Sequence, residues 1–176
     1  LRPDEVESER QAILEEILGS VNRVILEQLA RVNAEGGSPA LRLYRLIRLD
    51  VLQLCAFPYD IIEISRLSAL QEERFARFWE ERRALNRAVE DLVREGVAGG
   101  ELVEVDPRLA ALTLLANDEA TQNWHRPVGA LGQLEDDGYE PERIAGFSAD
   151  LAIGGLLRNR ARLDALRSEA RERDPA

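Results

Sequence analysis

The 176-residue sequence has no lysine, no methionine, one cysteine and one histidine. The single cysteine, Cys55, excludes a disulfide within the chain and is typical of a protein from a reducing compartment. The single histidine, His125, has no second ligand nearby for a zinc site of the Cys/His type. No run of about 18 apolar residues occurs, so no segment is expected to span a membrane.

Acidic residues outnumber basic ones, 33 to 23, which gives a net charge of −10. This balance is unfavourable for binding nucleic-acid phosphates. The contents of 45% hydrophobic and 32% charged residues are typical of a folded, helix-rich protein rather than a disordered one. The first ten residues, LRPDEVESER, are charged and unlike a signal peptide, so we expect a cytoplasmic location.

Apolar residues recur at helical spacing through most of the chain, and no stretch alternates with period two. We therefore predict an all-α fold of about six or seven helices without a sheet. Ser8 and Gln11 have the spacing of a capping box, which would delay the start of the first helix. The predicted segments are helices over 4–33 and 39–56, a short helix or turn over 59–67, helices over 70–95 and 107–124, a polar loop over 126–140, and a last helix over 141–158 that continues, more polar, through 159–172.

Several local signals mark the helix ends. Asp106-Pro107 predicts a helix start, because the Asp side chain accepts an amide hydrogen bond and Pro lacks an N–H that would stay unpaired. The sequence 36–39, GGSP, predicts the first break. The glycine cluster at 96–100 predicts the end of the long helix, with Gly96 as its left-handed residue. On the 39–56 helix, an exposed edge is expected to carry Arg42, Arg45 and Arg48.

Four stretches of the chain resemble the C-terminal domain of tetracycline-repressor-like (TetR family) transcription regulators. They are RLYRLIRLDVLQLCAFPYD (42–60), ERFARFWEERRALNRAVEDLVREGVAGGEL (73–102), VDPRLAALTLLANDEATQNW (105–124) and YEPERIAGFSADLAIGGLLR (139–158). The resemblance implies a TetR-like regulatory-domain helical bundle, with residues 1–176 as a C-terminal ligand-binding and dimerisation domain. The family's helix-turn-helix is absent from this sequence and would precede residue 1. Operator DNA would be bound only through that domain.

The resemblance also implies a homodimer in which the 107–124 helix and the last main helix pair with their copies across a two-fold axis. Small residues on one flank of the last helix would let a partner helix approach closely. Such an interface buries about 2,000 Å² or more. The alternative is that the small residues pack only within one subunit. The predicted interface residues are Leu112, Ala116, Ala120, Ala145, Ser148, Ala149, Ala152, Gly155 and Leu156.

Family members bind small, mostly apolar effectors between the helices of this domain, in pockets that hold a few polar groups. Polar residues on otherwise apolar helix faces are therefore candidate contacts. The alternative for the two charged candidates is a buried Asp50–Arg82 ion pair, because a buried charge must be paired. The predicted ligand-binding residues are Asp50, Leu54, Phe78, Trp79, Arg82, Asn86, Asn117, Thr121 and Trp124.

Enzyme signatures are missing from the sequence. There is no Glu-x-x-His pair for a di-iron bundle, no phosphate-binding G-x-x-x-x-G-K-[ST] loop and no G-x-S-x-G nucleophile motif. We therefore expect no catalytic residues, no cofactor and no metal site, and His125 is expected at a helix C-terminus. The predicted function is a ligand-responsive transcription regulator, most often a repressor in this family. The alternative is a helical dimerisation or adaptor module without a small ligand.

Overall fold

The computed structural model describes residues 2–58, 60–62, 66, 73, 75–125 and 138–174. Within these ranges the chain forms seven α-helices, one 3₁₀ helix and no strand, which confirms the all-α prediction. No helix of the described ranges is long and apolar enough to cross a membrane. The elements are α1 (Pro3–Glu35), α2 (Pro39–Ala56), α4 (Ala76–Ala98), α5 (Pro107–Ala120), α6 (Gln122–His125), α7 (Pro141–Leu156), η1 (Arg160–Arg162) and α8 (Leu163–Arg173).

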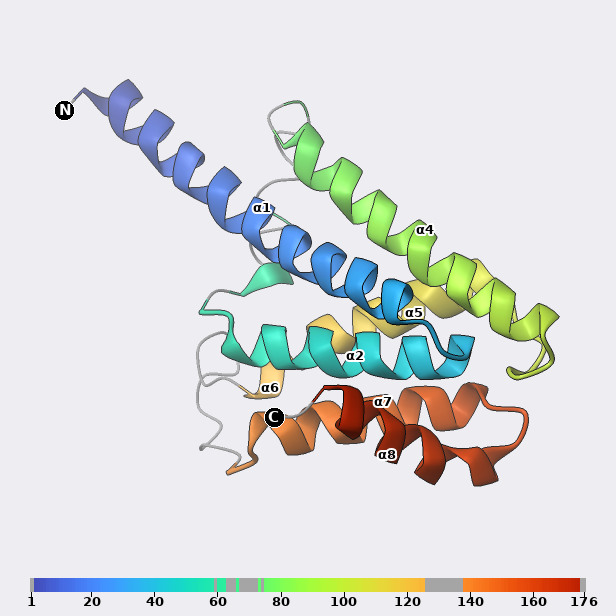
Figure 1. Cartoon of the computed structure of the whole chain (residues 1–176). Helices are drawn as coiled ribbons and strands as arrows, with labels where there is room; N and C mark the ends of the chain where they lie inside the picture. The colour runs from blue at the N-terminus through green and yellow to red at the C-terminus, as the bar shows by residue number, and fades with distance from the viewer. Residues whose placement is uncertain are drawn as a thin grey trace.

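Helix α2 lies at the centre of the bundle and contacts α1, α4, α5, α7 and α8 (Figure 1). It begins and ends where the sequence predicted. The Ser38 hydroxyl oxygen caps it by accepting a hydrogen bond from the Leu41 N–H at 3.3 Å, and Pro39 occupies the first turn. Local cap chemistry therefore marks the start of the central helix, and Glu101 Oε2 adds a tertiary contact there by accepting a hydrogen bond from the Ala40 N–H at 2.9 Å.

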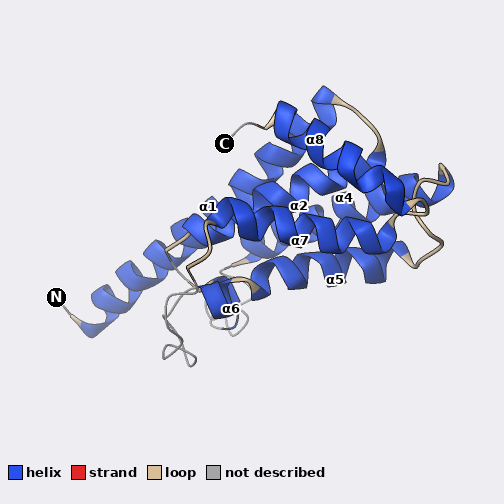
Figure 2. Ribbon diagram, turned by 90° about the horizontal axis from the view of Figure 1, so that it is seen from below, coloured by secondary structure: helices blue, strands red, loops and turns tan. Residues whose placement is uncertain are grey.

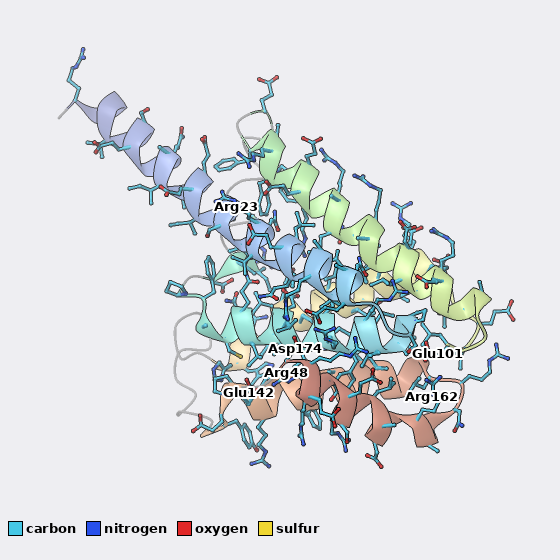
Figure 3. The ribbon with its side chains drawn as sticks, viewed as in Figure 1. Arg23, Arg48, Glu101, Glu142, Arg162 and Asp174 are labelled. Atoms are coloured by element: carbon cyan, nitrogen blue, oxygen red, sulfur yellow. The ribbon has the colours of Figure 1, made fainter. Side chains whose placement is uncertain are left out.

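The predicted exposed arginine edge of α2 is largely covered, and even Arg42, which pairs with Glu95, has only 14% of its side chain exposed. Arg45 and Arg48 are 0% and 5% exposed. Both guanidinium groups are buried as ion pairs, because Asp174, just after α8, supplies a carboxylate to Arg45 and Glu142 of α7 supplies one to Arg48. Arg48 binds Glu142 at 2.6 Å and donates to the Asp174 carbonyl oxygen at 3.0 Å (Figure 3).

Helix α1 runs without interruption from Pro3 to Glu35, so the capping-box spacing of Ser8 and Gln11 does not delay its start. Its N-terminal end projects away from the other helices in both views (Figures 1 and 2). The apolar side chains of Val6 and Ile13 on this projecting part are exposed. The C-terminal half packs on α2 and α4, with Ile25 and Leu29 in the main core.

The long helix α4 ends at Ala98, three residues later than predicted. Gly100, with a φ of +70°, is the left-handed residue, and Gly96 is helical. A Cβ on Gly96 would lie 2.6 Å from Leu102 Cδ1 and 3.3 Å from Pro39 Cβ. Gly96 is therefore required for the close approach of the next loop and of α2, which only the tertiary structure reveals.

Helix α5 begins as predicted, and Asp106 Oδ1 accepts the Leu109 N–H at 2.9 Å. It ends at Ala120, and the separate turn α6 follows, so the predicted single helix over 107–124 is divided. His125 lies in the last turn of α6, which confirms its position at a helix C-terminus.

The polar continuation predicted after 158 is a separate helix, α8, reached through η1. Backbone hydrogen bonds hold the end of α7 to the loop before α5. The Val103 N–H donates to the Leu156 carbonyl oxygen at 2.8 Å, and the Arg158 N–H donates to the Glu101 carbonyl oxygen at 3.0 Å. These bonds stop α7 and turn the chain back towards α2 and α7. Nearby, Glu101 also pairs with Arg162 at 2.7 Å (Figure 3).

The main core is formed by apolar side chains of α2, α4, α5 and α7, closed by α1 and α8. Predictions for 59–67 and 126–140 fall mostly outside the described residues, as do 70–72 and 74 at the predicted start of the long helix.

Candidate functional site

Helices α2, α4 and α5 bring four charged side chains together inside the bundle: Asp50, Arg82, Asp118 and Glu119, here named the carboxyl cluster. Asp50 and Asp118 are 7% and 1% exposed. Arg82 forms its ion pair with Glu119, and both side chains are 20% exposed. The predicted alternative, a direct Asp50–Arg82 pair, is thus wrong, because α5 supplies a nearer carboxylate. Arg82 still acts on Asp50 electrostatically.

The cluster perturbs the ionisation of its carboxyl groups. Burial raises the pKa of Asp50 to about 7, although the Arg82 charge opposes the shift. Burial and then the neighbouring Asp50 raise the pKa of Asp118. Burial also raises the pKa of Glu119, against the influence of Arg82. Removing a carboxylate from water disfavours its charged form, which is why all three pKa values shift upwards.

Asp50 and Asp118 satisfy one another only when one of them keeps its proton. Neither carboxyl oxygen of Asp118 accepts a hydrogen bond from a donor group of the described residues. Two ionised carboxylates would repel, whereas a protonated Asp118 can donate to Asp50. The cluster therefore holds three carboxyl groups and one guanidinium group. Its carboxyl oxygens can accept a hydrogen bond from a further donor.

Other buried polar atoms near these helices also lack partners within the described ranges. The Trp79 Nε1–H on α4 has no acceptor, and the Asn22 side-chain oxygen on α1 has no donor. Asn22 uses its amide nitrogen to bind the Phe78 carbonyl oxygen at 3.1 Å, which links α1 to α4. Buried polar groups are normally satisfied, so these orphaned atoms mark the α1–α2–α4–α5 interior as a candidate ligand environment.

The predicted ligand residues divide between this interior and the surface. Asp50, Leu54, Phe78 and Thr121 are buried, and Trp79 and Arg82 are half-buried. Asn117 and Trp124 are exposed, and Asn86 lines a groove between α4 and α5. Asn117 lies on the exposed side of α5, and Trp124 lies on α6, beyond the end of α5.

Sequence reasoning missed Asp118, Glu119 and Asn22. Asp118 follows Leu114 and Leu115 by one helical turn, and both of these side chains are buried. The criterion that selected Asp50, a charge on an apolar helix face, would also have selected Asp118.

A second candidate surface lies along α5 and α7, which run side by side (Figure 2). Leu109, Leu112, Phe147 and Leu151 are large apolar residues on these two helices, and they are 44–67% exposed. A groove of about 530 Å³ separates the two helices, and Leu109 and Leu151 lie in its lining. We name this surface the α5–α7 face.

The predicted dimer residues only partly coincide with this face. Leu112, Ala116 and Gly155 are exposed, and Ala120, Ala152 and Leu156 are half-buried. Ala145, Ser148 and Ala149 are buried within the subunit on the side of α7 that packs on α2. Their small size serves the close packing of α2 and α7, so any partner would meet Phe147 and Leu151 instead.

Comparisons with known proteins agree with this architecture. Residues 36–156 match the family described as Tetracyclin repressor-like, C-terminal domain. A transcriptional regulator of the TetR/AcrR family from Thermobifida fusca is 26% identical, with a TM-score of 0.60 over 82% of this chain and 73% of that chain. Comparison with curated proteins gives no match.

Two further solved structures share the fold at lower identity. AmtR of Mycobacterium smegmatis is 24% identical, with a TM-score of 0.64 over 89% of this chain and 70% of that one. AibR, solved with isovaleryl coenzyme A and operator DNA, is 21% identical, with a TM-score of 0.58 over 84% and 74%. Because the family match spans more than half of the sequence, the chain belongs to the tetracycline-repressor-like C-terminal domain family of the TetR regulators.

Proposed function

We propose that residues 1–176 are the ligand-binding and dimerisation domain of a homodimeric, ligand-responsive transcriptional repressor in the cytoplasm. A helix-turn-helix preceding residue 1 would read the operator. The observation that carries this proposal is the carboxyl cluster, an under-satisfied polar site enclosed by the helices of a family regulatory domain. A protein of the same fold, AibR, binds both an acyl-coenzyme A and operator DNA.

The effector would lie in the interior bounded by α1, α2, α4 and α5. Apolar neighbours such as Leu54 and Phe78 would contact a mostly apolar body, and the carboxyl cluster would accept its hydrogen-bond donor. A few placed polar groups in an apolar lining are typical of small-molecule sites.

The dimer would form through the α5–α7 face. Monomeric proteins rarely expose large contiguous apolar patches, so four large exposed apolar side chains on two neighbouring helices favour a covered surface. A two-fold axis would pair the face with its own copy, because the same surface is then used on both subunits.

The response would arise from unequal affinity of the effector for two arrangements of the helices. Helix α1 is the natural transmitter, since its C-terminal half packs in the bundle and its N-terminal end projects from it. The two helix-turn-helix domains of a dimer must lie about 34 Å apart to enter successive major grooves. A small rotation of α1 would change this separation.

The test uses the natural gene product. Its intact mass should exceed 19.8 kDa by about 5 kDa or more, roughly the mass of a minimal DNA-binding domain. The full protein should bind its operator as a dimer and release it when effector is added. An effector that binds tightly and leaves operator affinity unchanged would refute the proposed response.

The alternative adaptor function requires Asp50, Arg82, Asn86 and Asn117 to satisfy one another in the core. They do not do so: Arg82 pairs with Glu119, and Asn117 is exposed. We therefore favour the ligand-responsive function.

A further inference from the structure

A second groove, separate from the carboxyl cluster, lies between α4 and α5, which pack against one another (Figure 1). Its volume is about 340 Å³. The lining residues of each helix are spaced three or four positions apart, so they lie on one face of that helix. The residues that line it are Arg83, Asn86, Arg87, Glu90, Arg108, Ala111 and Leu112.

The charges in this groove are unbalanced. Arg83, Arg87 and Arg108 form no ion pair or hydrogen bond with any other residue that the structure describes. The one carboxylate of the groove, Glu90, is already bound to Arg94. Three arginines thus line one groove without an ion-pair partner among the described residues, although the chain as a whole carries a net charge of −10.

Arginines elsewhere in the described part of the chain are treated in both ways, since Arg158 and Arg171 also form no ion pair there. Arg45, Arg82 and Arg94 each contact a carboxylate of a neighbouring residue or helix. An acidic protein has many carboxylates available for such pairing. What distinguishes the groove is that three unpaired arginines line the same concavity, which gives it a local positive charge that an anion would balance.

We propose that the arginine groove binds a small phosphate-bearing organic anion. The planar guanidinium group presents a fork of donors that matches phosphate oxygens, and several of them suit an anion with more than one negative charge. Asn86 adds an amide donor, and Leu112, which is 44% exposed in the single chain, provides an apolar contact for the organic part. The volume fits a small ligand.

The same features argue against an extended nucleic acid in this groove. A long polyanion would also meet the negative field of the whole chain, whereas a small anion is held by short-range contacts. The site adds to the proposed function and does not depend on it, because an anion can bind here whether or not an effector occupies the interior.

The test measures binding of phenyl phosphate to the complete chain by calorimetry at low salt, with benzyl alcohol as the uncharged analogue. Phenyl phosphate should bind and benzyl alcohol should not, and added salt should weaken the binding. Arg87→Gln and Arg108→Gln should each weaken it about tenfold, the loss expected for a charge-assisted hydrogen bond. Arg171→Gln on α8, which makes the same charge change far from the groove, should leave the affinity unchanged.

Two results would overturn the proposal. Equal losses in all three variants would show that net charge, and not the groove, attracts the anion. Tighter binding of a short DNA duplex, with the same dependence on Arg87 and Arg108, would assign the groove to nucleic acid.

Discussion

Arg45 on α2 and Asp174 beyond the end of α8 form a buried ion pair across 129 residues of sequence, with Nε and Oδ2 at 2.7 Å. Asp174 also accepts from the Arg31 guanidinium on α1 at 2.8 Å. One carboxylate therefore fastens the C-terminal end of the chain to two helices of the bundle.

Replacing Asp174 by Ala should lower the free energy of unfolding by about 3 kcal/mol, because it leaves the fully buried Arg45 with only Glu35 as a partner. Urea denaturation measures the change. Asp164→Ala is the control, since that side chain is 86% exposed in its pair with Arg167 and should cost less than about 0.5 kcal/mol. Equal losses in the two variants would contradict a structural role for the buried pair.

Stability should fall as pH rises through the range in which Asp50 titrates. Its pKa is about 7 because of burial, so between the ordinary Asp value of about 4 and pH 7 the folded state binds more protons than the unfolded state. The slope is negative and at most about 1.4 kcal/mol per pH unit for one proton. Asp50→Asn should flatten the pH profile measured by thermal unfolding, and Asp91→Asn on the surface should leave it unchanged. A wild-type profile that rises from pH 5 to 7 would contradict this assignment.

At low pH the stability that Asp174 contributes should change with pH in the opposite direction, rising as the pH rises. Burial alone would raise its pKa, but hydrogen bonds from Arg45 and Arg31 hold the pKa below its ordinary value. Its contribution is therefore present above the unfolded-state pKa and is lost as pH falls through the folded-state value. Acid denaturation of Asp174→Asn should show a smaller loss of stability below about pH 4 than the wild type does. An acid-denaturation profile of Asp174→Asn that matches the wild type below about pH 4 would refute this account.

Leu151→Glu and Phe147→Glu should convert the proposed dimer to folded monomers, because each places a charge in the centre of the α5–α7 face. Sedimentation velocity gives the mass, and circular dichroism confirms the fold. Val24→Glu, an exposed apolar residue of α1, is the matched control and should remain dimeric. Wild-type protein that sediments as a monomer at high concentration would remove the dimer from the proposed function.

Three glycine-to-alanine changes should alter the free energy of unfolding differently, two of them lowering it and one raising it. Gly96→Ala should destabilise by about 1–3 kcal/mol, since its Cβ would overlap Leu102. Gly100→Ala should cost about 1 kcal/mol through its positive φ alone. Gly146→Ala, inside α7 with nothing within 4 Å of the added Cβ, should stabilise by about 0.5–1 kcal/mol. Chemical denaturation of the three variants checks the order, and equal effects would contradict it.

Local sequence determined the helices and most of their ends. Ser38-Pro39 and Asp106-Pro107 start α2 and α5 because a cap and a proline act within one turn and need no distant partner. Hydrophobic periodicity predicted helices and no sheet, because the spacing of apolar residues along the chain shows which side chains share one buried face. The order of the four helical stretches was enough to indicate the TetR regulatory domain.

Tertiary structure decided which polar residues meet. Arg45 was predicted to be exposed, but the return of α8 buries it, and nothing in its neighbourhood along α2 indicates a carboxylate at position 174. Arg82 has Asp50 and Glu119 within its electrostatic reach, and only the packing of α5 on α4 selects Glu119. A helix pattern defines a face, but the element that covers this face comes from elsewhere in the chain, so the pairing of charges and the burial of small residues were set by the assembled bundle.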